Sequence, residues 1–404
     1  MRGLDTIWSS FKQERQIWPL LIMICCTMMG SGMVVPVLSL YAASFGVTST
    51  LVGMLVTIFG VGRLLANFPS GWLSQQTGRR PLLVAGPLII AVGSIGAALT
   101  TDFVQLCFWR FVQGVGSGMY LTVSLAALAD LSTAATRARL VGLYQLALQM
   151  GATLGTVFGG YAAKFFGITA PFWALLVISL LTAILAIFSF QDTKASPSAS
   201  LSGAMGSGKR GMFSAQFMGI SFVSGVSFFT RTACMFQLIP LIAHDSFGLD
   251  VSRIGLGIGI IAVTMMLMMP FSQLLIQKAG ARMAVGYSMV GMAIALLAII
   301  AGAEQYWFWL SMVLYGVFGG LNGPAIGAYS IAILPRRQYG SGMGLQRTLS
   351  DIGFVAGPVV VGLIDDFSGI GHAGGIMANA ALLVVSTLIF LFVSARRSAA
   401  ASEQ

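Results

Sequence analysis

Long apolar segments follow one another along almost the whole chain, and this feature restricts the possible folds more than any other. Each segment has about the 20 residues that a helix needs to cross a bilayer, and only 8% of the 404 residues are charged. A soluble domain carries about 25% charged residues and could not bury an apolar content of 57%. Because backbone polar groups in lipid must be paired within the protein, the sequence predicts an all-α membrane protein.

The segments divide into two sets of six, so we expect twelve transmembrane helices. Their predicted ranges are 17–43, 49–75, 81–100, 103–129, 138–163, 168–190, 213–243, 251–277, 282–302, 305–333, 340–364 and 374–395. The stretch "QDTKASPSASLSGAMGSGKRG" between the sets is rich in Ser, Gly and Ala, which is typical of a flexible linker. We therefore predict an N-terminal six-helix bundle at 1–190, a cytoplasmic linker at 191–212 and a C-terminal six-helix bundle at 213–404.

The basic residues are distributed unevenly among the predicted loops. Most of the 22 Lys and Arg lie near the two ends of the chain or in alternate loops, as Arg80, Lys209 and Arg336 do. The other set of loops holds only Lys164 and Arg253. This positive-inside bias places both termini in the cytoplasm. The formal charge of +10 thus reflects membrane topology, and we expect no nucleic-acid partner.

The two predicted bundles also share a sequence register. An offset of 202 residues aligns Gly78 with Gly280 and Arg80 with Arg282. The same offset pairs residues 44–46 with 246–248, Gly53 with Gly255, Gly114 with Gly316, Gly118 with Gly320, Gly142 with Gly344, Gly151 with Gly353, Gly155 with Gly357 and Gly160 with Gly362. We interpret the set as a tandem repeat of two pseudo-symmetric bundles, which alternating access requires. A duplicated scaffold without transport is the alternative.

One loop carries a resemblance to a known family. In "PSGWLSQQTGRRPLL", Gly71, Leu73, Gly78, Arg79 and Arg80 match the motif G-x-L-(A)-D-(R)-x-G-R-(K/R), with Gln75 in place of the acid. The chain resembles a major facilitator superfamily transporter over nearly its whole length, and most of all the drug:proton antiporter branch. The expected fold is therefore the two-bundle fold of that family.

The residue types in this cytoplasmic gating loop suggest individual roles. Gly71 would let its helix approach a neighbour closely, and Gly78 would permit a tight turn. The resemblance implies that Arg79 pairs with Asp130, and that the family's acid faces the N-terminus of helix 340–364. Gln75 can accept a hydrogen bond there without bringing charge, so we expect a weaker latch. The alternative is a neutral residue without consequence.

Glycine-rich stretches within the helices match two further family motifs. "RFVQGVGSG" holds Arg110 and resembles R-x-x-x-G-x-G-x-G. "GATLGTVFGG" resembles the antiporter motif G-x-x-x-G-P-x-x-G-G, although Thr156 replaces the proline, while "GFVAGPVVVG" keeps the Gly-Pro pair. The predicted helix-packing residues are Gly114, Gly118, Gly151, Gly155, Gly353, Gly357 and Pro358. We expect the small residues of the last two stretches to pack closely across the interface of the two bundles.

Charged residues inside the predicted spans are the candidate site. An intramembrane charge is costly and usually functional, and the arginines at 63, 110, 231 and 347 outnumber the single clear acid, Asp351. Arg347 and Asp351 are four residues apart and can pair, so Asp351 is either a proton carrier tuned by Arg347 or half of a static pair. The predicted substrate and proton pathway comprises Arg110, Gln113, Arg231, Gln237, Asn322, Arg347 and Asp351. This charge balance favours an anionic or zwitterionic small-molecule substrate.

Other residue types point to no further chemistry. Cys25, Cys26, Cys107 and Cys234 fall inside apolar helices with no metal-binding or disulfide spacing. His244 and His372 are isolated in the sequence, and we expect both to be surface residues. We expect no metal, no cofactor and no enzymatic activity.

These observations together predict a secondary active transporter of the inner membrane, working as a monomer in the lipid bilayer. Proton-coupled efflux of a small organic solute is the first hypothesis, and proton-coupled uptake of an organic anion is the alternative. A non-transporting membrane sensor is the third reading.

Overall fold

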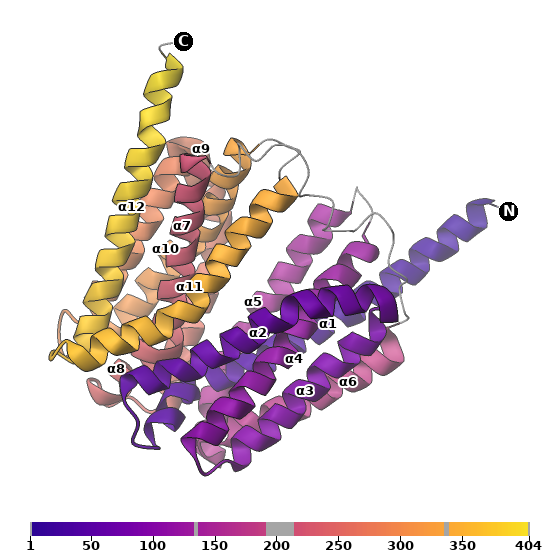
Figure 1. The fold of residues 1–404 in the computed structure, drawn as a ribbon, viewed down its shortest axis with the longest axis horizontal. Helices are drawn as coiled ribbons and strands as arrows, with labels where there is room; N and C mark the ends of the chain where they lie inside the picture. The colour runs from indigo at the N-terminus through magenta and orange to yellow at the C-terminus, as the bar shows by residue number, and fades with distance from the viewer. Residues whose placement is uncertain (1, 133–135, 191–213, 335–338, 403–404) are drawn as a thin grey trace. The chain divides into compact units, whose positions relative to one another are not determined.

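The computed structural model describes residues 2–132, 136–190, 214–334 and 339–402, and the described residues form helices and short turns (Figure 1). The helices are α1 Arg2–Ala43, α2 Ser49–Thr77, α3 Arg80–Leu99, α4 Phe103–Asp130, α5 Arg137–Phe166, α6 Ala170–Ser189, α7 Ala215–Ala233, α8 Ile239–Asp245, α9 Val251–Ile299, α10 Gln305–Ile333, α11 Tyr339–Phe367 and α12 His372–Ser402. A π-helical turn, Cys234–Leu238, joins α7 to α8. The predicted linker 191–212 lies outside the described residues.

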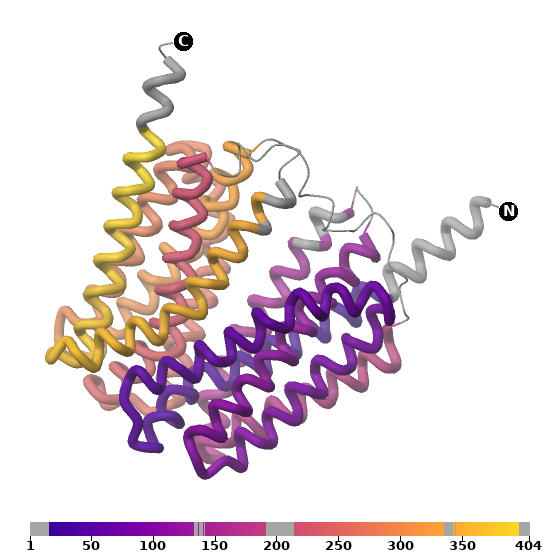
Figure 2. Tube along the Cα trace, in the orientation of Figure 1, coloured from indigo at the N-terminus to yellow at the C-terminus, as the bar shows by residue number. Residues whose placement is uncertain are grey.

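Ten helical segments of the described chain are long and apolar enough to cross a membrane. One of them, α9, runs from Val251 to Ile299 and covers two predicted spans, 251–277 and 282–302. Its backbone leaves helical geometry at Gly280, where φ is 79° and ψ is 154°. The break expected between these two spans is therefore present within α9. Figure 2 traces the course of the chain through the helices in the same orientation as Figure 1.

The chain forms two compact units. The first comprises Met1–Val37 and Ile58–Ser200, and the second comprises Leu38–Thr57 and Leu201–Gln404. The end of α1 and the start of α2 thus belong to the second unit, whereas the predicted bundle boundaries placed them in the first. In the first unit α3 packs against α4 and α6, and in the second α7 packs against α11 (Figure 1).

The predicted repeat is visible in the backbone. Among the described residues, six of the seven glycines with positive φ form pairs at the offset of 202 residues, namely Gly46 with Gly248, Gly78 with Gly280 and Gly167 with Gly369. A side chain is strained at such φ values, whereas glycine is not. The two bundles therefore turn between helices at equivalent positions.

Close helix packing repeats at the same offset. A Cβ atom at Gly118 would run into the carbonyl oxygen of Arg63, so α4 lies directly on α2. In the second unit a Cβ at Gly320 would meet the carbonyl oxygen of Met265, the residue equivalent to Arg63, so α10 lies on α9 in the same way. Gly114 and its counterpart Gly316 make the corresponding contacts one turn earlier. Small residues permit this approach.

The expectation that the small residues of α5 and α11 pack across the two predicted bundles is met only in part. Pro358 and Gly362 of α11 lie against Gly53 and Ser49 of α2, which the predicted boundaries placed in the other bundle, whereas four glycines pack within their own unit. In α5, a Cβ at Gly151 would strike the carbonyl oxygen of Cys25, and one at Gly155 would strike that of Met29. Both partners lie on α1 in the first unit. In α11, a Cβ at Gly353 would strike the carbonyl oxygen of Gly225, and one at Gly357 would strike that of Phe229. Both partners lie on α7 in the second unit. These glycines therefore hold each unit together internally.

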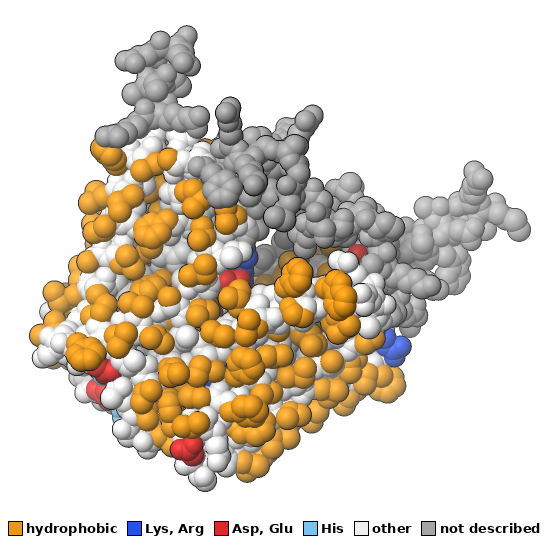
Figure 3. All heavy atoms as spheres, viewed as in Figure 1, with side chains coloured by type: hydrophobic (Ala, Val, Ile, Leu, Met, Phe, Trp, Pro, Cys, Tyr) orange, Lys and Arg blue, Asp and Glu red, His pale blue; other side chains and the backbone are white. Residues whose placement is uncertain are grey.

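Hydrophobic side chains cover most of the described surface on the face shown in Figure 3. Phe68, Phe188 and Phe367 are 84%, 83% and 84% exposed. Monomeric soluble proteins rarely expose apolar patches of this extent, so the surface is suited to lipid. The interior of the first unit packs Met23, Tyr120 and other apolar side chains of α1, α3, α4, α5 and α6. The protein is a multi-pass membrane protein.

Candidate functional site

The turn between α2 and α3 is held by a buried ion pair. The Nε atom of Arg79 donates to Oδ2 of Asp130 at 2.9 Å, and both side chains are only 4% exposed. The Arg79 guanidinium also donates to the hydroxyl of Ser74. Gly78, with φ of 91°, makes the turn that brings Arg79 to the end of α4. The pairing of Arg79 with Asp130 is thus present, while the gating role of the loop stays a prediction.

The other predicted residues of this loop, Arg80, Gly71 and Gln75, differ in the contacts they make. Arg80 donates to the carbonyl oxygen of Ile187 at the end of α6, and its counterpart Arg282 donates to that of Leu391 in α12. A Cβ at Gly71 would meet only Thr122 at 3.7 Å, an ordinary contact, so the expected close approach at Gly71 is wrong. Gln75 is exposed on α2, and its latch role stays a prediction.

Arg110 lies in the interior of the first unit, where it is 4% exposed on α4. Its Nη1 donates to Oε1 of Gln113 at 2.8 Å, and Gln113 donates in turn to the hydroxyl of Ser94 at 3.1 Å. The guanidinium lies 4.5 Å from the ring centroid of Phe59, a cation–π contact. Within the described residues no carboxylate pairs with Arg110. The predicted neighbours Arg110 and Gln113 are in contact, and the partner of the guanidinium is a neutral amide.

A second group of charges lies in the second unit. Arg231 on α7 is half-buried and interacts electrostatically with Tyr315 on α10 and with Arg347 on α11. Nε of Arg347 lies 3.3 Å from Oδ1 of Asp351, one helical turn further along α11. The Arg347 guanidinium also lies 5.5 Å from the ring centroid of Phe228. The structure therefore pairs Arg347 with Asp351 and places Phe228 beside Arg347. Arg231 lies within electrostatic range of Arg347 and Tyr315, and the sequence did not suggest Tyr315 or Phe228.

The π-helical turn Cys234–Leu238 begins three residues after Arg231, at the end of α7. Pro240 lacks an N–H group and cannot donate to the carbonyl four residues before it, which explains why the regular ladder is interrupted just before that residue. A π-turn widens a helix and is frequent at functional sites. The turn places Gln237 in the interior, where its amide donates to the carbonyl oxygen of Ser49 at 2.8 Å. Gln237 thus holds the start of α2 and does not join Arg231.

Asn322 is also occupied by a structural contact. Its amide donates to the hydroxyl of Ser288 at 3.0 Å, and the side chain is only 5% exposed. This bond ties α10 to the second part of α9. Asn322 and Gln237 were predicted to line the substrate pathway, and that role stays a prediction. In the structure the Asn322 amide donates to a side-chain hydroxyl and the Gln237 amide to a backbone carbonyl.

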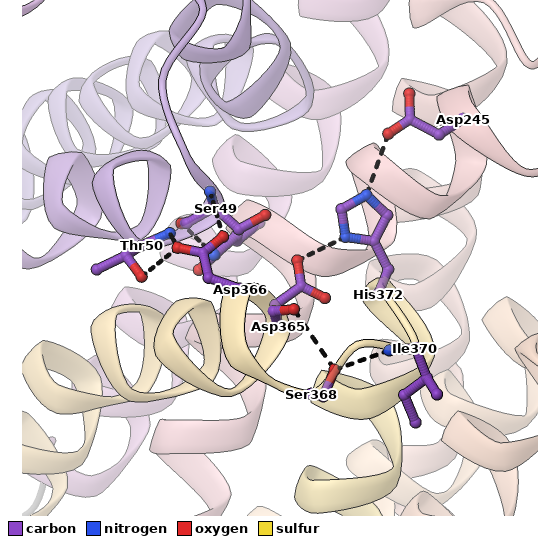
Figure 4. A network of polar contacts seen from close by, with 9 residues as sticks. Ser49, Thr50, Asp245, Asp365, Asp366, Ser368, Ile370 and His372 are labelled. Carbon is purple, nitrogen blue, oxygen red and sulfur yellow. Dashed lines mark hydrogen bonds and ion pairs between the residues drawn. The ribbon is translucent and has the colours of Figure 1, made fainter.

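A polar network that was not predicted from the sequence lies at the far end of α11 (Figure 4). The ring of His372 lies with Nδ1 2.7 Å from Oδ2 of Asp365 and with Nε2 3.1 Å from Oδ2 of Asp245. The next residue, Asp366, accepts from the backbone N–H groups of Ser49 at 3.0 Å and Thr50 at 2.9 Å. The expectation that His372 is an isolated surface residue is therefore wrong.

The arrangement offers charge and hydrogen bonding without the groups of a reaction centre. Among the described residues there is no cluster of three or more His, Cys, Asp or Glu that could hold a metal ion. What the two units do offer is a set of arginines within helices of membrane-spanning length, with an acid beside one of them.

Comparison with known proteins gives a consistent result. The Major Facilitator Superfamily profile matches residues 20–358 and 220–404. The chain is 22% identical over 367 residues to the uncharacterized MFS-type transporter MJ1560 of Methanocaldococcus jannaschii, covering 89% of this chain and 94% of that one. It is 22% identical over 370 residues to multidrug resistance protein 2 of Bacillus subtilis, covering 89% and 91%.

A solved structure agrees in fold. The crystal structure of a D-xylose-proton symporter superposes with a TM-score of 0.73 at 17% identity, covering 95% of this chain and 97% of that one. Because the family profile matches well over half of the residues, the chain belongs to the Major Facilitator Superfamily of membrane transporters, and it is not an enzyme.

Proposed function

We propose that the protein exports a small organic anion or zwitterion across the plasma membrane by alternating access, in exchange for protons. The observation that carries the proposal is the charge balance around Arg231. Arg231 and Arg347 contribute two positive charges, and Asp351 contributes one negative charge that is paired with Arg347. Within the described residues no hydrogen bond or ion pair joins the Arg231 guanidinium to a protein group.

An unpaired charge inside a membrane protein is costly, and a bound anion would offset that cost. Arg231 presents a planar guanidinium that binds a carboxylate through two parallel hydrogen bonds. Phe228, which is partly exposed beside Arg347, supplies an aromatic surface for the apolar side of a small organic solute. Arg110 in the first unit is a second buried cation without a carboxylate partner among the described residues.

Efflux is the preferred direction because multidrug resistance protein 2, a relative over nearly the full length, is a resistance protein by name. Thr156 in α5 replaces the proline of the family's antiporter motif, and this departure supports uptake of an organic anion as the second candidate. In either case we propose twelve spans, both termini in the cytoplasm and a monomeric transport unit.

Ligand binding can be tested with purified protein. Thermal unfolding is measured in the presence of organic carboxylates, zwitterions and lipophilic cations. A ligand at about 100 times its dissociation constant stabilises the protein by about 2.7 kcal/mol, which raises the unfolding temperature measurably. Stabilisation by anions or zwitterions is expected, and stabilisation by lipophilic cations alone would exclude the proposed substrate class.

Matched variants locate the binding site. Arg231→Gln removes the unpaired charge, whereas Arg253→Gln removes an exposed arginine in the first turn of α9. The anion-induced shift is expected to disappear in the first variant and to remain in the second. Equal shifts in both variants would show that Arg231 does not bind the substrate.

Direction and coupling require transport in everted vesicles. Addition of substrate is expected to release an imposed proton gradient if the exchange is antiport. Asp351→Asn is expected to abolish this release while substrate binding is retained, since Asp351 is the acid nearest the arginine group. Unchanged export in Asp351→Asn would remove Asp351 from the proton pathway.

A further inference from the structure

The end of α11 joins three other parts of the second unit through carboxylates. Asp365 contacts His372 at the start of α12, and the same ring contacts Asp245 at the end of α8. Asp366 points the other way, toward the first turn of α2 (Figure 4). Two successive residues of α11, Asp365 and Asp366, thus link the contacts of the His372 ring to the N-terminus of α2.

The two contacts of the His372 ring define how many protons the cluster holds. A neutral imidazole has one N–H group and one acceptor nitrogen, whereas the imidazolium has two N–H groups. Both ring nitrogens lie within hydrogen-bond distance of a carboxylate oxygen, 2.7 Å from Asp365 and 3.1 Å from Asp245. With two ionised carboxylates, a neutral ring would place a nitrogen lone pair against one of them. The arrangement therefore needs one proton beyond those of a neutral histidine.

Burial strengthens the argument. The Asp365 side chain is only 3% exposed, and its Oδ1 atom is buried without a hydrogen-bond partner. A buried carboxylate is costly unless a positive charge lies beside it, and the charged groups that contact the ring are Asp365 from α11 and Asp245 from α8. The imidazolium is the group that offsets the charge of Asp365.

We propose that Asp245, Asp365 and His372 form a proton-binding site, and that the bound proton fixes the end of α11 from which Asp366 caps α2. The Asp366 carboxylate accepts from the N–H groups of Ser49 and Thr50 and from the Thr50 hydroxyl. Negative charge at a helix N-terminus is favourable. When the proton leaves, repulsion between the ring and a carboxylate loosens the end of α11, and the cap on α2 weakens.

The role of this site in coupling rests on the proposed function, but proton binding itself can be measured without transport or substrate. The chain has only two histidines, so His244→Gln leaves His372 as the single one. Nitrogen-15 solid-state NMR of histidine-labelled protein in lipid bilayers, purified without a polyhistidine tag, then reports one ring. At pH 7 both nitrogens are expected to show protonated shifts, and Asp365→Asn is expected to give a neutral ring.

The link to α2 is tested by hydrogen exchange of the peptide that contains residues 46–57. After correction for the intrinsic effect of pH, exchange in the wild type is expected to be about five-fold faster once the proton is lost, as the loss of one helix cap implies. His372→Gln is expected to remove this pH dependence, and His244→Gln to retain it. If His372→Gln does not fold, Asp245→Asn, which alters the more exposed carboxylate, replaces it.

Two results would overturn the proposal. One is a neutral His372 ring at pH 7 in the His244→Gln protein. The other is the same pH dependence of exchange in His372→Gln, or in Asp245→Asn where that variant replaces it, as in the wild type. Neither measurement depends on whether the protein exports anions, so a failed transport assay would leave this inference unaffected.

Discussion

Gly155 in α5 offers the sharpest test of how the first unit is packed, through the substitution Gly155→Ala. A Cβ at this position would run into the carbonyl oxygen of Met29 and lie 2.9 Å from the Cα atom of Gly32. These are backbone atoms of α1, which cannot rotate aside as the end of a long side chain can. To accept the methyl group, α1 must move away from α5, and the contacts along their shared length must loosen.

The magnitude follows from a comparison within the same helix. Overpacking a well-packed contact costs about 1–3 kcal/mol, whereas Gly→Ala in a helix gains up to about 1 kcal/mol in propensity. A Cβ at Gly142, also in α5, meets nothing within 4 Å. Gly142→Ala therefore has the propensity gain without the clash, and the two variants should differ in unfolding free energy by about 1–3 kcal/mol.

Thermal unfolding of purified protein, followed by tryptophan fluorescence, ranks the variants. The expected order of stability is Gly142→Ala, then wild type, then Gly155→Ala. The second unit provides a repeat of the test, since Gly357→Ala meets the carbonyl oxygen of Phe229 and Gly327→Ala meets nothing within 4 Å. If Gly155→Ala proves as stable as Gly142→Ala, the close contact of α5 with α1 is not present in the protein.

Three further outcomes are expected. Asp130→Asn breaks a buried ion pair and should lower the free energy of unfolding by about 3 kcal/mol, with an unchanged melting temperature as the contrary result. Gln75→Asp should shift the conformational equilibrium toward the outward-open form, which cysteine accessibility would show; an unaltered accessibility pattern would reject the latch role. Asp366→Ala should cost about 1 kcal/mol by loss of a helix cap, and less at high salt because the carboxylate is exposed; a salt-independent effect would exclude the charge–dipole part of that contact.

The sequence predicted the helices well because hydrophobic length and loop glycines are local signals. The break near Gly280 was expected from its match with Gly78, and both residues have positive φ in the structure. Arg79 and Asp130 were paired by resemblance to a family motif, and the ion pair is present at 2.9 Å. Each of these predictions rests on a short segment or on a spacing that repeats.

Features that depend on distant segments were missed. His372, Asp365 and Asp245 come from three helices, and nothing in the spacing of these residues in the sequence indicates that they meet. Gln237 was placed in the substrate pathway because it is polar within an apolar span, yet its amide binds the backbone of Ser49. A polar residue in a span signals a partner, but the partner can be a backbone group 188 residues away.

The cap of α2 by Asp366 has a consequence for how the protein is made. Ser49 and Asp366 are 317 residues apart in the chain, and synthesis proceeds at about 5–20 residues per second. The first turn of α2 therefore waits roughly 15 to 60 seconds for its partner to leave the ribosome. For the first 188 residues of this interval Gln237, the other partner of Ser49, is absent as well, so Leu38–Thr57 has neither anchor in the second unit. The newly made first unit must persist in the membrane with this hairpin unanchored, which makes it the segment where early degradation or chaperone binding should concentrate.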